Sequence, residues 1–244
     1  MPPAAETVDS AQKMTRMYRW TRHVYDASRR YYLLGRDRML RQIARLPAGA
    51  VLEIGCGTAR NLRVLARTAP HHTLHGLDAS HSMLDTARSK LDRTGTRDRI
   101  TLEHGLAQAL SSRRRVGPNR AFDVIFFSYV LSMIPDWPAA LRGALHHLAP
   151  GGRLYIVDFW DQGNLPPWFA GALQRWLAQF DVSPRPDLLA LLTHWDRVEG
   201  LSSAVLPVAR RYAYLATIRV TDRVPRPALA ALEEDAPPEP SLSP

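Results

Sequence analysis

The middle of the chain alternates short apolar runs with segments of helical periodicity. The apolar run at residues 51–54 is followed at once by apolar residues near helical spacing, which predicts a buried strand, a tight turn and a helix. The alternation continues to Gly152 and predicts four parallel strands joined by helices, with a fifth strand starting at Arg153. Residues 201–209 and 211–220 predict a closing hairpin. The expected fold class is therefore α/β, with a mostly parallel sheet.

Both ends of the chain and one aromatic stretch depart from this alternation. Residues 1–14 are polar and residues 223–244 are rich in proline and acid, so we expect disorder at both ends. Residues 15–46 predict a helical cap on a single domain that spans residues 15–222. A further stripe of aromatic and apolar residues near helical spacing comprises Trp168, Phe169, Leu173, Trp176, Leu177 and Phe180. It either faces the core or forms a flap that contacts lipid over the mouth of the substrate site.

Composition indicates a globular protein without a membrane span. Hydrophobic residues make up 45% of the 244 positions, yet no apolar run approaches the roughly 20 residues that a spanning helix needs. The N-terminal residues lack the apolar core of a secretory signal. Cys56 is the only cysteine, so no intrachain disulfide can form and we expect a cytoplasmic location.

Positive charge is in excess, and almost all of it is arginine. The net charge is +9, which attracts anionic membranes and nucleic acid alike. The triple arginine at residues 113–115 favours a solvated face. A larger group of arginines lies in the N-terminal part of the chain and comprises Arg16, Arg19, Arg22, Arg29, Arg30, Arg36, Arg38 and Arg41. This group either forms a solvated face or contacts an anionic lipid surface.

The turn after the first predicted strand contains two glycines one residue apart, Gly55 and Gly57. Such glycines let the backbone approach a ligand closely, and the following helix N-terminus offers free N–H groups. Asp78 ends the second predicted strand, where a carboxylate can accept two hydroxyl hydrogen bonds from a ribose. A dinucleotide fingerprint needs a third glycine where this chain has Arg60, which disfavours a nicotinamide oxidoreductase.

The residues of this turn resemble the first motif of class I S-adenosylmethionine-dependent methyltransferases. Glu53, Gly55 and Gly57 match that motif, and Ala59 stands where the family has a further glycine. The resemblance implies a Rossmann-like, seven-stranded sheet with S-adenosylmethionine as cofactor, whose ribose Asp78 would hold. The segment 103–110 resembles the part that caps the adenine, with Leu106 where the family often has an aspartate. The cofactor-binding residues expected are Glu53, Gly55, Cys56, Gly57, Asp78, Ala79, Met83, Gly105, Leu106, Ala107 and Ser128.

Longer segments resemble the bacterial betaine-lipid N-methyltransferases. They lie at residues 24–37, 128–137, 157–162 and 176–185, within a resemblance that covers roughly residues 18–220. This family trimethylates the homoserine amine of diacylglyceryl-homoserine. The resemblance implies a glycerolipid substrate, peripheral contact with an anionic membrane surface, and an enzyme that supplies the homoserine lipid as a partner. Another small amine or a quinone-type ring is the alternative substrate, and a non-catalytic basic module is the alternative class of protein.

Methyl transfer to an amine needs the neutral form of that amine, held in line with the methyl group. Tyr129 lies just past a continuously apolar strand and Asp158 lies near the end of the next, so both are expected at the cleft as acceptors that orient the amine. Tyr25 is the third candidate catalytic residue, closing over the site from the N-terminal segment. The adjacent histidine pairs at residues 71–72 and 146–147 do not share one face, so we expect no metal. With a glycerolipid as the implied substrate, we expect no nucleic-acid partner.

Overall fold

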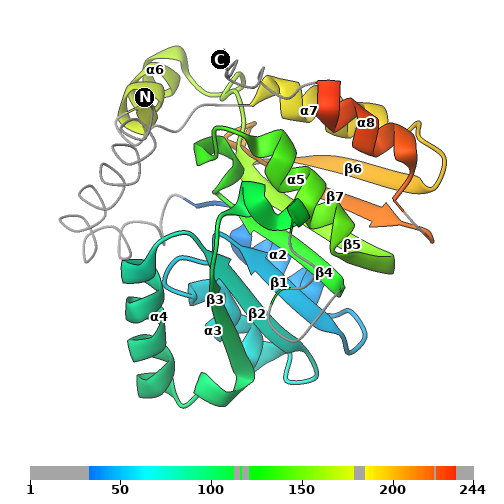
Figure 1. Cartoon of the computed structure of the whole chain (residues 1–244). Helices are drawn as coiled ribbons and strands as arrows, with labels where there is room; N and C mark the ends of the chain where they lie inside the picture. Colours follow the sequence, from blue (N-terminus) through cyan, green and yellow to red (C-terminus); the bar gives the residue numbers. More distant parts are fainter. Residues whose placement is uncertain (1–32, 113–115, 117–120, 179–184, 223, 235–244) are drawn as a thin grey trace, which may run out of the picture. The chain divides into compact units, whose positions relative to one another are not determined.

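A computed structural model describes residues 33–112, 116, 121–178, 185–222 and 224–234 (Figure 1). The chain divides into one unit of residues 1–34 and another of residues 35–244. Every helix and strand described below belongs to the second unit. The predicted N-terminal helical cap is therefore described only through its last helix, α2 (Arg36–Ala44).

The second unit is built on one seven-stranded sheet with the order β3-β2-β1-β4-β5-β7-β6. The first five strands pair in parallel, and β7 runs antiparallel to both of its neighbours. This arrangement confirms the predicted α/β fold and its closing hairpin. The strands are β1 (Ala50–Ile54), β2 (Thr73–Asp78), β3 (Ile100–His104), β4 (Phe122–Ser128), β5 (Leu148–Phe159), β6 (Leu201–Val208) and β7 (Ala213–Val220).

Helices cover both faces of the sheet. In Figure 1, α2 and α3 lie behind the strands while α5 and α8 lie in front of them. Right-handed crossovers between neighbouring parallel strands place α3 and α4 on the same face. The remaining helices are α3 (Arg60–Thr68), α4 (His81–Thr94), α5 (Trp137–His146), α6 (Pro167–Ala178), α7 (Pro186–Trp195) and α8 (Arg226–Glu234), with short 3₁₀ turns η1 (Arg97–Arg99), η2 (Ala107–Ser112) and η3 (Leu131–Met133).

The central strands are apolar on both faces because each face is covered by helices. In β4, residues 124–127 form an unbroken apolar run, and Ile125, Phe126 and Phe127 have no exposed surface. Burial of one such side chain contributes roughly 1.5–3 kcal/mol to folding. The rigid middle of the sheet therefore holds the carboxyl ends of β1 and β4 in fixed positions, and those ends carry the site.

The C-terminal region differs from the prediction of disorder after residue 222. Residues 226–234 form α8, in which Ala228 and Leu232 are fully buried. Their spacing of four residues puts both on one helical face, which packs on the core beside α5. The prediction weighed the proline and acid content of the whole segment and missed this local apolar face.

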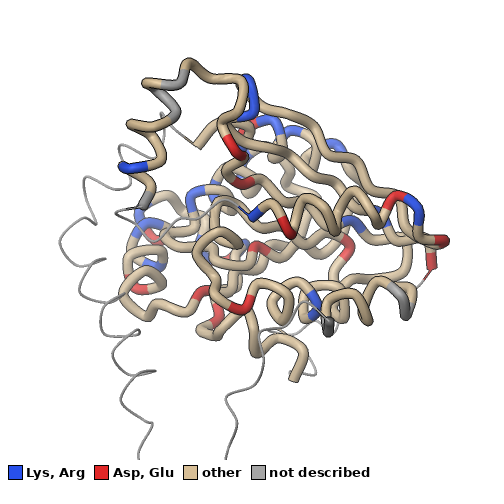
Figure 2. Tube along the Cα trace, turned by 90° about the horizontal axis from the view of Figure 1, so that it is seen from above, with Lys and Arg blue, Asp and Glu red and all other residues tan. Residues whose placement is uncertain are grey.

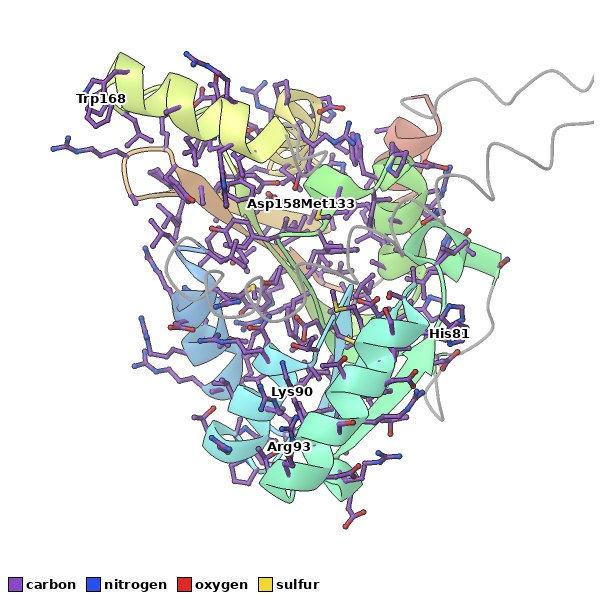
Figure 3. The ribbon with its side chains drawn as sticks, turned by 90° about the vertical axis from the view of Figure 1, so that its left-hand side faces the viewer. His81, Lys90, Arg93, Met133, Asp158 and Trp168 are labelled. Atoms are coloured by element: carbon purple, nitrogen blue, oxygen red, sulfur yellow. The ribbon has the colours of Figure 1, made fainter. Side chains whose placement is uncertain are left out.

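The aromatic stripe predicted at residues 168–180 has a mixed environment. Leu177 is 2% exposed whereas Trp168 is 76% exposed, and Trp176 is half-buried. Figure 3 shows Trp168 at the outer end of α6. Phe180 lies outside the described residues. Part of the stripe thus faces the core and its first tryptophan faces outward. Within the described ranges, no helix has the length and apolar character needed to traverse a bilayer.

Candidate functional site

The turn between β1 and α3 is held on the neighbouring strand by its backbone. The N–H groups of Gly55 and Cys56 both donate to the carbonyl of Leu77, at 2.8 and 3.1 Å. Gly55 and Gly57 adopt left-handed backbone with φ of 73° and 54°. Ala59 also has a positive φ, 57°, at the N-cap of α3. The backbone at Ala59 therefore keeps the left-handed conformation that the glycine of the related motif would adopt. For an L-residue this conformation costs roughly 1–2 kcal/mol.

The two glycines are needed for different reasons. A Cβ on Gly55 would lie 2.5 Å from Cγ2 of Val130, so this position must stay bare for the loop to pack against the segment after β4. Around Gly57, no described atom lies within 4 Å of the place a Cβ would take. The backbone of Gly57 thus faces open space, as expected for a loop that a ligand approaches.

Asp78 ties this loop to the start of α4. Its Oδ2 accepts the Gly57 N–H at 2.7 Å and its Oδ1 accepts the Ser80 N–H at 2.8 Å. Ser80 is the N-cap of α4, and its Oγ accepts the Met83 N–H at 3.4 Å. The Asp78 carbonyl accepts the Gly105 N–H at 3.0 Å. One residue therefore links the ends of β1, β2 and β3, and its carboxylate is an acceptor of the kind that binds ribose hydroxyls.

The acidic residue of β1 is buried with a polar partner. Glu53 is 2% exposed, and its Oε1 accepts the Asn61 side-chain amide at 2.7 Å, which fixes the first turn of α3 beneath the loop. Cys56 packs toward Gly76, where an added Cβ would meet its sulfur at 2.8 Å. Burial, followed by the charges of Asp78 and Glu53, raises the pKa of the Cys56 thiol well above its usual value. Cys56 is therefore a packing residue whose backbone serves the loop.

The predicted adenine segment follows β3. Gly105 and Ala107 are buried, while Leu106 is 47% exposed. His104 stacks on His81, the first residue of α4, with ring centroids 3.6 Å apart. The neighbouring Ala79 carbonyl lies 3.0 Å from Nε2 of His104. Histidine rings thus border this end of the site, a feature the sequence reasoning missed because it depends on two separate elements.

Ser128 and Tyr129 end β4 at the same edge of the sheet. Ser128 is 8% exposed, and among the described residues its Oγ has no hydrogen-bond partner. Tyr129 is 2% exposed and has a φ of 57°, and its N–H donates to the Val157 carbonyl at 2.8 Å. Burial, then the proximity of Tyr212 and Asp158, raises the pKa of Tyr129 well above its usual value, so its hydroxyl stays protonated. The buried Ser128 hydroxyl, which has no partner among the described residues, suits a ligand contact at this edge.

Asp158 holds the segment that follows β4. It is 2% exposed, and its oxygens accept the Ser132 N–H at 3.0 Å, the Ser132 hydroxyl at 2.8 Å and the Phe159 N–H at 2.8 Å. Burial raises the pKa of Asp158, and the hydrogen bonds from Ser132 act in the opposite direction. Figure 3 shows Asp158 beside Met133, the last residue of η3. Ser132 is a functional candidate that the sequence reasoning missed, although a serine inside the apolar run at residues 130–134 was a signal.

The strand register brings most predicted residues to one edge of the sheet. Ile54 pairs with Leu77 and with Phe127, so the positions that follow β1, β2 and β4 are neighbours. Ser128 pairs with Val157, which places Asp158 at the same edge. Tyr25 lies outside the described residues, and its predicted role stays a prediction. Within the described part of the chain, no group of three or more His, Cys, Asp or Glu side chains could hold a metal ion.

Comparisons with known proteins agree with this geometry. A family model described as a methyltransferase domain matches residues 52–154. The chain is 33% identical over 117 residues to trans-aconitate 2-methyltransferase of Methylobacterium radiotolerans, a match that covers 47% of this chain and 40% of the relative. It is 30% identical over 164 residues to demethylmenaquinone methyltransferase of Deinococcus radiodurans, which covers 65% of each. The chain thus spans less than two thirds of these curated relatives.

Solved structures share the fold. An S-adenosylmethionine-dependent methyltransferase from Aquifex aeolicus superposes with a TM-score of 0.58 at 16% identity, over 79% of this chain and 93% of the other. The sheet order is that of a Rossmann-like methyltransferase fold, and the glycine loop lies within the residues that the methyltransferase-domain model matches. Residues 52–154 thus match a methyltransferase domain, and the chain shares the fold of a solved S-adenosylmethionine-dependent methyltransferase.

Proposed function

We propose that this chain is an S-adenosylmethionine-dependent methyltransferase that acts on the homoserine amine of diacylglyceryl-homoserine and converts it to the trimethylated betaine lipid. The observation that carries the proposal is the position of the segments that resemble betaine-lipid N-methyltransferases. Residues 128–137 begin at the end of β4, and residues 157–162 begin at the end of β5. Both therefore lie where a substrate would meet the cofactor.

S-adenosylmethionine supplies an activated methyl group on a sulfonium, so the protein mainly has to position the two reactants. The Gly57 backbone and the Asp78 carboxylate would hold the cofactor, with Ser128 Oγ donating to it. Tyr129, whose hydroxyl stays protonated, would accept a hydrogen bond from the amine and orient its lone pair. The contacts of Asp158 favour a positioning role, since its oxygens already hold Ser132 and Phe159.

A quinone-type acceptor is the second candidate. It is favoured by the similarity to demethylmenaquinone methyltransferase, which extends over 65% of this chain. A reduced quinone ring and an amine lipid differ in the atom that receives the methyl group. The position of the label therefore distinguishes the two candidates. Label on the lipid amine would support the first candidate, and label on the ring would support the second.

The test is methyl transfer by the purified full chain, with labelled S-adenosylmethionine and three acceptors: diacylglyceryl-homoserine, soluble homoserine and a demethylated quinone. We expect one, two and three methyl additions on the homoserine lipid by mass spectrometry. Asp78→Ala should abolish cofactor binding and transfer, whereas Asp85→Ala, which removes an exposed partner of Arg88 on α4, should leave both intact. Transfer only to the quinone would refute the lipid proposal, and transfer by the Asp78 variant would refute the cofactor placement.

A lipid acceptor also requires an enzyme that attaches homoserine to diacylglycerol, because that reaction must supply the substrate. We place both activities at the cytoplasmic face of the membrane, with this chain bound peripherally. Co-purification of the two activities with the membrane fraction would support this placement.

A further inference from the structure

The exposed surface of α2 and α3 carries a row of arginines that have no acidic partner among the described residues. Arg38, Arg41 and Arg45 are spaced i, i+3 and i+7 along α2 and its C-cap, which places them on one face over a length of about 10 Å. All three are exposed, as is Arg67 in the last turn of α3, which packs beside α2. We call Arg38, Arg41, Arg45 and Arg67 the arginine face.

No described residue forms an ion pair or a side-chain hydrogen bond with these four guanidinium groups. Other basic side chains have acidic partners, as with Arg88 and Asp85 or Arg97 and Asp92. The sole acidic residue of α2 and α3 is Asp37, and its carboxylate is paired with Arg60. The positive charge of the arginine face is therefore not neutralised by the helices that carry it. Figure 2 marks the Lys and Arg positions of the described chain in blue and the Asp and Glu positions in red.

An anionic surface of fixed, closely spaced charges fits this face. Guanidinium groups bind phosphate through two parallel hydrogen bonds, and several of them on one helix face reach several headgroups at once. Nucleic acid is the less suitable partner, because single strands are held by aromatic side chains between basic ones and neither α2 nor α3 contains an aromatic residue.

We propose that the arginine face docks on the anionic headgroups of a bilayer and holds the enzyme at the surface where its substrate lies. This inference rests on the proposed function, because docking at a membrane serves an enzyme whose substrate is a lipid. Binding to vesicles can nevertheless be measured without that substrate. The pairing of Asp37 with Arg60 joins the first turns of α2 and α3 at the end of the sheet that carries the glycine loop. Arg38 directly follows Asp37, so the arginine face begins at the end of α2 that lies beside the cofactor loop.

The experiment is sedimentation of the full chain with vesicles of phosphatidylcholine, alone or mixed with phosphatidylglycerol. We expect binding to the mixed vesicles only, and weaker binding as salt is raised. The triple variant Arg38→Gln, Arg41→Gln, Arg45→Gln should bind about 100-fold more weakly, since each arginine near an anionic surface accounts for about a five-fold change. Its circular dichroism spectrum should match that of the wild type, because all three side chains are exposed.

The matched control removes the same charge from α4, with Arg88→Gln, Lys90→Gln and Arg93→Gln (Lys90 and Arg93 are labelled in Figure 3). These side chains alternate with Asp85 and Asp92, so we expect less than a five-fold change. Equal weakening by both triple variants would show that net charge alone acts, and would overturn the proposal. The proposal would also be overturned if the wild-type protein did not bind anionic vesicles. It would fail as well if RNA displaced the protein from the vesicles and bound it through Arg38, Arg41 and Arg45.

Methyl transfer in detergent separates this inference from the proposed function. The arginine-face variant should transfer methyl groups to detergent-dispersed homoserine lipid at the wild-type rate, because none of its three residues contacts the cofactor loop. The homoserine lipid could fail as a substrate while vesicle binding is still lost in the arginine-face variant. In that case the proposed function would be wrong and the docking surface would still be supported.

Discussion

Replacing Ser132 by alanine removes one of the bonds that hold the segment after β4. In the wild type the Ser132 hydroxyl donates to Oδ1 of Asp158 at 2.8 Å, and both residues are 2% exposed. The Ser132→Ala change keeps the backbone N–H bond to Oδ2 but leaves the buried carboxylate with one donor fewer. Because Asp158 is 2% exposed, we expect solvent to compensate little of this loss.

The magnitude follows from the charge on the acceptor. A hydrogen bond to a charged group contributes about 1.5–3 kcal/mol, so we expect the free energy of unfolding to fall by about 2 kcal/mol. For a domain of this size that corresponds to a decrease in Tm of about 4–8 °C. Ser132→Thr retains the hydroxyl and should recover most of the loss.

The effect should depend on pH in a defined direction. Burial raises the folded-state pKa of Asp158 above its unfolded value, so the stabilisation from Asp158 is greatest below the unfolded pKa and is lost as pH rises through the folded pKa. Removal of the Ser132 donor raises that pKa further. The deficit of Ser132→Ala relative to the wild type should therefore be small at acid pH and grow toward neutral pH.

Urea denaturation at several pH values measures this deficit directly. Cofactor affinity, measured by calorimetry, should be unchanged, while kcat should fall because η3 follows directly on Tyr129. A deficit below about 0.5 kcal/mol at neutral pH, or one that does not vary with pH, would show that the bond between Ser132 and Asp158 does not hold this segment.

Three further changes test the cofactor loop. Ala59→Gly removes the cost of a left-handed alanine, but it also removes a buried methyl group. The two effects oppose each other, so urea denaturation should show a free energy of unfolding within about 1 kcal/mol of the wild type. A larger loss would contradict the strain assigned to Ala59. Gly55→Ala should disrupt the loop through Val130 and lower Tm strongly. Gly57→Ala, at a φ of 54°, should lose only the roughly 1–2 kcal/mol that a left-handed L-residue costs and so lower Tm less, but it should lose cofactor binding in calorimetry; an equal loss of Tm in the two variants would refute the distinction between them. Iodoacetamide should alkylate Cys56 far more slowly in the native protein than in urea because burial raises its pKa, and rapid native labelling by mass spectrometry would contradict that burial.

The parts of the fold that sequence predicted are those set by local patterns. The run at residues 124–127 predicted a central strand because only a strand covered on both faces is apolar throughout. The hairpin at residues 201–220 was also predicted, but the insertion of β7 between β5 and β6 was not, since strand pairing over long separations leaves no local pattern. The same limit applies in the site. Gly55, Gly57 and Asp78 were predicted because a tight turn and a strand end restrict the residues allowed there.

The bond between Ser132 and Asp158 joins residues 26 positions apart and depends on how the segment after β4 folds back. Sequence placed Tyr129 at the strand end correctly, but its positive φ could not be foreseen, because tyrosine has no preference for left-handed backbone. The residues at the strand ends were thus predicted, whereas the hydrogen bond that joins Ser132 to Asp158 was not.

The position of β7 has a consequence for biosynthesis. β6 reaches the rest of the sheet only through β7, and β5 has no neighbour on that side until residues 213–220 are available. During translation, the nucleotide-binding half of the sheet can close early, while an unsatisfied strand edge persists until the last of the seven strands leaves the ribosome. Such an edge invites pairing between nascent chains. We therefore expect ribosome-bound chains ending before residue 213 to depend on chaperones, and chains that include β7 to be released from them.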